Sequence, residues 1–113
     1  MNGKLTRLMD TATLEAMLEQ GQDNALLRFT LGNLLYQQQD YANAARHLAR
    51  ATELNPDYSA AWKLYGRTLT AAGRYPEASR AFQQGITVAE QRGDLQAAKE
   101  MQVFLRRVEK QSK

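Results

Sequence analysis

Apolar residues recur along most of the chain at the three-to-four-residue spacing of amphipathic helices. Two such stripes are Leu27, Leu31, Leu34 and Leu35, and then Ala45, Leu48, Ala49 and Thr52. This spacing places side chains on one face of a helix and does not match the two-residue alternation of a strand. Polar breaks separate the stripes at 38–40, 55–57 and 72–74. The pattern predicts antiparallel helices joined by short turns.

Residues that start or stop helices lie at these breaks. Pro56 disfavours helical backbone at Asn55, and Gly73 can take the positive φ of a residue that follows a helix. Asp23 and Asp57 are the expected N-caps of the helices that follow them, because their side-chain oxygens can accept hydrogen bonds from free backbone N–H groups. The breaks therefore predict the helix boundaries.

The pattern returns after 34 residues. Eight pairs of positions match at this shift, namely Asp23 with Asp57, Leu31 with Tyr65, Gly32 with Gly66, Leu35 with Leu69, Tyr41 with Tyr75, Ala44 with Ala78, Leu48 with Phe82 and Ala51 with Gly85. In each unit the glycine and alanine let two helices approach closely, and Leu48 or Phe82 fills the space one turn further on. A period of this length predicts a stack of helix pairs.

These residues resemble the tetratricopeptide repeat (TPR) family. The second unit, 59–92, matches the family signature at Trp62, Tyr65, Gly66, Leu69, Tyr75, Ala78 and Phe82. The first unit, 25–58, matches it at Leu31, Gly32, Leu35, Tyr41, Ala44, Leu48, Ala51 and Pro56. Arg28 replaces the usual aromatic residue of the first unit, and Glu90 replaces the usual proline of the second. The missing proline predicts that the helix beginning at Tyr75 continues to about Arg92.

The resemblance implies an all-α, right-handed helical-repeat solenoid, similar to the short free-standing bacterial TPR proteins. One domain, 1–113, would hold about six antiparallel helices. Because two units alone leave apolar end faces, we expect a half repeat at 11–20 and a capping helix at 94–110. The capping helix would begin at Asp94 and bury Leu95, Ala98, Met101, Leu105 and Val108. Its outer face would carry Lys99, Glu100, Arg106, Arg107 and Lys110.

The resemblance also implies a concave groove that binds a peptide, lined by the first helix of each unit. The family's groove positions fall here on Phe29, Asn33, Tyr36, Lys63, Arg67 and Thr70. Their spacing places each trio on one helix face. The family's two-carboxylate clamp is incomplete, because Phe29 replaces its first lysine and Leu64 its second asparagine.

The side chains of these positions suit an extended peptide with an acidic group. Asn33 can both donate and accept hydrogen bonds with a peptide backbone, and Lys63 with Arg67 can bind a carboxylate. Phe29 and Tyr36 offer apolar and stacking contacts. The alternative is that this face is only solvated, or is covered by the N-terminal segment.

Composition argues against catalysis. The chain has no cysteine, and its single histidine, His47, is expected on the surface. Neither a thiolate or histidine metal site nor a serine–histidine relay can be assembled from this set, and the glycines do not form a phosphate-binding loop. We therefore predict a protein that is not an enzyme and has no cofactor and no metal.

Charge and hydropathy limit the classes of partner that the protein can be expected to bind. Ten basic and six acidic residues follow from Asp57 onward, and five basic and six acidic residues precede it. This imbalance is too small for the basic face that nucleic acid requires, and the 35-residue period of RNA-binding helical repeats is absent. No apolar run reaches the length of a membrane span, and the N-terminus does not resemble a signal peptide. The expected partner is another protein or peptide in the cytoplasm, with no nucleic acid and no membrane.

A second hypothesis is self-association. Met101, Val103 and Phe104 give the last helix more apolar surface than one packing face needs, and exposed apolar patches often mark interfaces. The chain would then be a monomer or a weak homodimer.

Overall fold

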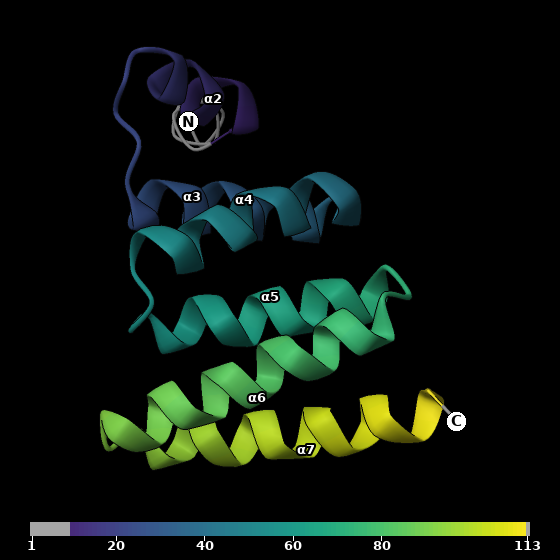
Figure 1. Ribbon diagram of the computed structural model, residues 1–113. Coiled ribbons are helices and arrows are strands. Elements are labelled where there is room, and N and C mark those ends of the chain that lie inside the picture. The colour runs from purple at the N-terminus through teal and green to yellow at the C-terminus, as the bar shows by residue number, and fades with distance from the viewer. Residues whose placement is uncertain (1–9, 113) are drawn as a thin grey trace, which may run out of the picture.

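The computed structural model describes residues 10–112, and this part of the chain forms six α-helices and no strand (Figure 1). The helices are α2 (Thr11–Glu19), α3 (Ala25–Gln37), α4 (Tyr41–Leu54), α5 (Ser59–Ala71), α6 (Tyr75–Gln91) and α7 (Leu95–Gln111). They stack along one axis of a body that measures 43 × 28 × 27 Å. The predicted all-α solenoid is confirmed. Residues 1–9 and 113 of the expected domain lie outside the described residues.

Each helix packs mainly on its neighbour in the sequence. The strongest pairs are α3 with α4, α5 with α6, and α6 with α7, and α4 packs on α5 to join the two units. Leu14 of α2 is buried against α3, and Met17 and Leu18 pack on the same cluster. A segment far too short to bury a core alone is thus stabilised by its place in the stack.

The predicted breaks end the helices for the predicted reasons. Asn55 has an extended φ of −142° before Pro56, and α4 stops at Leu54. Gly73 has a φ of 77° just after α5. In the first unit the same place in the turn belongs to Gln39, whose φ of 65° puts a residue with a Cβ in the left-handed region. The long helix is also confirmed, because α6 ends at Gln91.

Two of the expected N-caps are wrong. The cap of α3 is Asn24, whose side chain accepts from the backbone N–H of Leu27 at 2.8 Å. Tyr58 occupies the cap position of α5 and makes no side-chain cap bond. Both helices begin one residue later than Asp23 and Asp57 predict. Asp94 does cap α7 through the backbone N–H of Ala97.

Close packing at the glycines explains how the paired helices nest. A Cβ on Gly32 would lie 2.5 Å from Cγ of Leu48, and one on Gly66 would overlap the Phe82 ring. Ala44 and Ala78 on the facing helices are fully buried. Gly85 repeats the arrangement between α6 and α7, where a Cβ would lie 2.5 Å from Sδ of Met101. The predicted role of the small residues is confirmed at Gly32 and Gly66.

His47 is not a surface residue. Its side chain is only 4% exposed, and Arg28 Nη1 donates a 2.9 Å hydrogen bond to its Nδ1 atom. Arg28 also forms an ion pair with Asp23 at 2.8 Å. Burial, followed by the positive charges of Arg46 and Arg28, lowers the pKa of His47 to about 4. The expectation of an exposed histidine fails because Arg28 satisfies the ring, which removes most of the cost of burying it.

Candidate functional site

One side of the solenoid is built from α3, α5 and α7. Of these helices α3 contacts α5, and α5 contacts α7. Tyr36 of α3 and Arg67 of α5 meet there, with the guanidinium carbon 5.7 Å from the centre of the tyrosine ring. Lys63, one turn before Arg67, reaches α7 instead. The two predicted trios therefore lie on helices that are neighbours in space.

The last helix adds a third trio that the sequence did not reveal. Glu100, Phe104 and Arg107 have the same spacing as the other trios, and the first two contact Lys63 and Arg67. We call the three trios together the groove face. It consists of Phe29, Asn33 and Tyr36, then Lys63, Arg67 and Thr70, and finally Glu100, Phe104 and Arg107.

The predicted outer face of the last helix is therefore wrong at Glu100 and Arg107. The third trio lies three residues beyond the 34-residue period, and α6 has 17 residues where α4 has 14. The three extra residues of α6 shift the positions of α7 by three residues relative to the 34-residue period. Glu90 in place of proline was the available signal.

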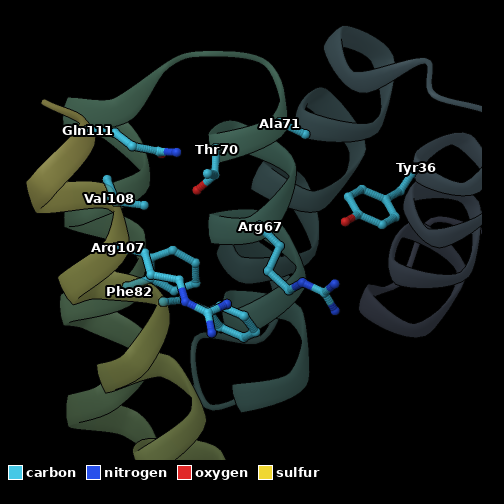
Figure 2. Close-up of a pocket in the computed structure, with 9 residues that line it drawn as sticks. Tyr36, Arg67, Thr70, Ala71, Phe82, Arg107, Val108 and Gln111 are labelled. Atoms are coloured by element: carbon cyan, nitrogen blue, oxygen red, sulfur yellow. The ribbon is translucent and has the colours of Figure 1, made fainter.

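A cavity of about 250 Å³ opens on the groove face toward the C-terminal ends of α5 and α7 (Figure 2). Its base is apolar and includes the buried side chains of Phe82 and Val108. The lining residues are Tyr36, Arg67, Thr70, Ala71, Phe82, Phe104, Arg107, Val108 and Gln111. Of the six predicted groove residues, the cavity brings together Tyr36, Arg67 and Thr70.

Arg67 and Arg107 supply positive charge at this cavity. The guanidinium carbon of Arg67 lies 5.2 Å from the centre of the Phe104 ring, and that of Arg107 lies 6.0 Å from the same centre. Neither arginine forms an ion pair with any residue between 10 and 112. Stacking on an aromatic face leaves the N–H edges of a guanidinium free to donate.

Lys63 differs from these arginines because its charge is already matched. Its Nζ atom donates to Oε1 of Glu100 at 2.9 Å, which joins α5 to α7. The hydrogen bond from Lys63 is the main reason that the pKa of Glu100 is lowered. The cationic part of the groove face is thus Arg67 with Arg107, whereas the sequence predicted Lys63 with Arg67.

Phe29 and Asn33 lie outside the cavity lining. Phe29 packs on Tyr58, with ring centres 5.0 Å apart. Asn33 is half-buried on α3, one turn before Tyr36. Thr70 does line the cavity, and it donates its hydroxyl to the Gly66 carbonyl at 2.8 Å, so its oxygen can only accept a further hydrogen bond.

Other chemistry is sparse in the described part of the chain. No group of three or more histidine, cysteine or acidic residues there could hold a metal ion. Over the same residues, no helix combines the length and hydropathy needed to span a membrane. The cytoplasmic location stays a prediction.

Comparison with known proteins assigns this chain to a protein family. Residues 35–101 match the family model described as tetratricopeptide repeat. The chain is 50% identical over 97 residues to the TPR repeat-containing protein PA0015 of Pseudomonas aeruginosa, covering 86% of this chain and 92% of that protein. This chain belongs to the tetratricopeptide repeat family. TPR repeats generally mediate protein–protein interaction, and TPR proteins are generally not catalytic.

Solved TPR-like structures agree with the fold. The solution structure of protein BPP2914 from Bordetella parapertussis superposes with a TM-score of 0.75 at 46% identity, covering 89% of this chain and 88% of that one. A structure of MamA has a TM-score of 0.64 at 23% identity, covering 99% of this chain and 71% of that one. The second likeness concerns the fold alone.

The apolar surplus expected on the last TPR helix is mostly absent. Met101 is fully buried beneath Gly85, and Phe104 stacks on Phe82 with ring centres 5.7 Å apart. Val103 remains 39% exposed, and the prediction that Leu95 is buried is wrong, because Leu95 is 61% exposed at the start of α7. Two of the three residues that suggested self-association therefore pack within the chain, and the oligomeric state stays a prediction.

Proposed function

We propose that this TPR protein is a non-catalytic adaptor or scaffold that binds an extended segment of a partner protein along the groove face. The observation that carries the proposal is the cavity on that face, where Arg67 and Arg107 stand over an apolar base without ion-pair partners among residues 10–112. Apolar pockets with a few convergent polar groups are typical of binding sites.

The dimensions of the groove face suit an extended chain. Packed helices lie about 8–10 Å apart, and an extended peptide advances about 3.3 Å per residue. A peptide that crosses α3, α5 and α7 would therefore meet a new helix about every third residue. Repeated trios on successive helices can contact such a peptide at regular intervals.

Each trio would make a different contact. Asn33 can hold the peptide backbone, because its amide both donates and accepts. Arg67 and Arg107 can bind an acidic group. Phe29, already packed on Tyr58, presents an aromatic surface to an apolar side chain. The partner that fits is a peptide segment with apolar and acidic residues.

A capture experiment with matched variants tests the proposal. Immobilised protein with Asn33→Ala and Arg67→Glu should lose the partner that the unchanged protein captures from lysate. The control carries Gln84→Ala and Arg80→Glu, an amide-to-alanine change and the same charge reversal at exposed positions of α6, and should retain it. Lys63 is left unchanged because an acidic residue there would face Glu100. Equal capture by both double variants contradicts the proposal.

A further inference from the structure

We infer that the two ends of the solenoid bind each other between copies of this chain, with the outer side of α7 in one copy docked on the outer side of α2 in the next. Figure 1 shows α2 and α7 at opposite ends of the stack, so each copy can bind one neighbour at either end. The contact uses neither the groove face nor its cavity. The inference therefore goes beyond the proposed function and does not depend on it.

The outer side of α7 has lost the residues that let helices nest within the chain. Counted with the three extra residues of α6, Val103 stands where α5 has Gly66. In the same count, exposed Arg106 stands where α5 has the fully buried Leu69. Gly66 makes room for the Phe82 ring of α6, and a valine cannot. A partner of this side must therefore pack on a flatter and charged helix face.

Positive charge lines that face of α7. Lys99, Arg106 and Lys110 are exposed and share one helical stripe with Val103, opposite the buried Met101. None of the three cations forms an ion pair with any residue between 10 and 112. The stripe covers about 16 Å of the helix, at 1.5 Å per residue. The C-terminal end of the stack is thus a basic surface with an exposed apolar residue at its middle.

The opposite end of the stack is complementary in charge and shape. Leu14 of α2 is buried toward α3, and the other side of α2 exposes Ala12, Glu15, Ala16 and Glu19. Among residues 10–112, neither glutamate has an ion-pair partner. Small residues such as the two alanines let a facing helix approach closely. This end therefore offers unpaired carboxylates beside a shallow apolar surface.

The two ends also match in spacing. Each has an apolar residue followed by two like charges at i+3 and i+7, namely Ala12, Glu15 and Glu19 on α2, and Val103, Arg106 and Lys110 on α7. Helices that run side by side in the same direction meet in layers with this spacing. In that register the valine lies on the alanine, and each cation faces one carboxylate. One arrangement thus covers the exposed valine and pairs both glutamates.

The charges favour a head-to-tail contact over a symmetric one. Two α7 helices packed on each other would bring like cations together, and two α2 helices would do the same with their glutamates, which is unfavourable. A contact between two different surfaces adds copies at both ends and forms open chains or closed rings. Nucleic acid or anionic lipid would also attract the cations of α7. Neither of these partners would use the carboxylates of α2.

Sedimentation equilibrium of the full chain tests whether it associates. Exposed ion pairs are weak and are screened by salt. We expect an average mass that rises above the monomer mass of 12.8 kDa toward millimolar protein. The rise should be clear at about 0.1 M ionic strength and largely lost at about 1 M. A mass of 12.8 kDa at every protein concentration and in both salts overturns the inference.

Two charge-reversed variants test which surfaces meet. The α2 variant carries Glu15→Lys and Glu19→Lys, and the α7 variant carries Arg106→Glu and Lys110→Glu. Each variant alone should associate about tenfold more weakly, because its two ends then repel each other. The control, Arg80→Glu with Arg92→Glu, makes the same change in net charge as the α7 variant at exposed positions elsewhere. It should associate like the unchanged chain.

A mixture of the two variants separates a head-to-tail contact from every other arrangement. The basic α7 of the α2 variant faces the acidic α2 of the α7 variant, so the mixture should associate nearly as strongly as the unchanged chain. Such recovery also shows that both variants are folded. A mixture that stays monomeric, or an equal loss in the control, overturns the inference. If the unchanged chain stays monomeric and binds phosphatidylserine vesicles instead, the basic stripe is a lipid-binding surface and the inference is wrong.

This inference and the proposed function fail separately. Partner capture depends on the groove face, and a single copy retains that face when the ends no longer bind. Association depends on α2 and the outer side of α7, and the changes at Asn33 and Arg67 leave both intact. If both proposals hold, a chain of copies presents several groove faces, and a partner with repeated segments gains avidity.

Discussion

The two repeat units keep the same backbone arrangement with different side-chain chemistry. In the second unit, the Trp62 side chain lies near Ala81, and its Nε1–H donates to the Pro56 carbonyl. In the first unit, Arg28 takes the place of the tryptophan, and buried His47 takes the place of the alanine. A large residue facing a small one has been exchanged for a hydrogen-bonded polar pair.

This exchange shows what the repeat requires at that position. The helices need the space filled and every buried polar atom satisfied, and no buried side-chain nitrogen or oxygen lacks a partner among residues 10–112. An apolar and a polar solution both meet these needs. Only the polar solution contains a histidine, and burial holds the pKa of His47 well below its ordinary value, so the two units should respond differently to acid.

Acidification gives the largest expected difference between the units. The pKa of His47 is about 4 in the folded chain, against an ordinary value of 6.5. The unfolded chain therefore binds more protons between pH 4 and 6.5. The stability that neutral His47 contributes is fully present above pH 6.5 and is lost as the pH falls toward 4. We expect a loss of up to about 3 kcal/mol in the free energy of unfolding.

Urea denaturation at a series of pH values measures this loss. The matched variant is His47→Gln, which keeps an uncharged acceptor for Arg28 and should show a much flatter profile between pH 4 and 6.5. Asp23 is the acidic group of the same cluster, and its pKa is lowered mainly by its hydrogen bond to Arg28. The stability that ionised Asp23 contributes is therefore lost at lower pH than the stability that neutral His47 contributes. Parallel profiles for the two proteins would show that His47 is not the titrating group.

The glycines at which paired helices pack closely, Gly32 and Gly66, give an intermediate difference in stability between the units. A methyl group on Gly66 would meet the rigid Phe82 ring, whereas one on Gly32 would meet the more flexible Leu48 side chain. Both changes raise helix propensity by about 1 kcal/mol, and overpacking typically costs about 1–3 kcal/mol. We expect Gly66→Ala to destabilise the chain by about 2 kcal/mol, and Gly32→Ala by clearly less.

Thermal or urea unfolding of the two single variants provides the comparison. Adding Phe82→Leu to Gly66→Ala should destabilise less than the sum of the two single changes, because the smaller side chain relieves the overlap. If the destabilisations of Gly66→Ala and Phe82→Leu are strictly additive, or if Gly32→Ala destabilises the chain more than Gly66→Ala, this explanation of the close packing is wrong.

The turns give the smallest difference. Gln39 and Gly73 share a positive φ at equivalent places, and only glycine adopts it without a steric cost. Gln39→Gly should stabilise the chain by up to about 1 kcal/mol, and Gly73→Gln should destabilise it by about 1 kcal/mol. Gln38→Gly, next to the turn at a φ of −83°, serves as the control and should give no gain in melting temperature. A gain at Gln38 as large as that at Gln39 would exclude the φ-based reason.

Much of the fold follows from the sequence because local rules and the repeat agree. The 34-residue period, the small residues at Gly32 and Gly66, and the breaks at Pro56 and Gly73 gave the helices nearly to the residue. The N-cap of α3 was missed by one residue because Asp23 and Asn24 are both good caps. Burial of His47 does not follow from the residue type alone; it follows from the repeat, in which the equivalent position holds the small, buried residue Ala81.

The site could be predicted only in part. The faces of α3 and α5 follow from helical spacing, so Tyr36, Arg67 and Thr70 were identified. Contacts with α7 depend on a register that changes where α6 gains three residues, and the repeat no longer predicts it. That shift brings Glu100 to Lys63 and Arg107 to the cavity, which changes the cationic pair on the groove face.

The groove face is tested most directly by NMR titration of the isotope-labelled protein with its captured partner segment. We predict shifts at the side chains of Asn33, Arg67 and Arg107, with the exposed residues of α4 and α6 unchanged. Shifts confined to α4 and α6, or to the outer side of α7 around Val103, would contradict a binding surface built from α3, α5 and α7.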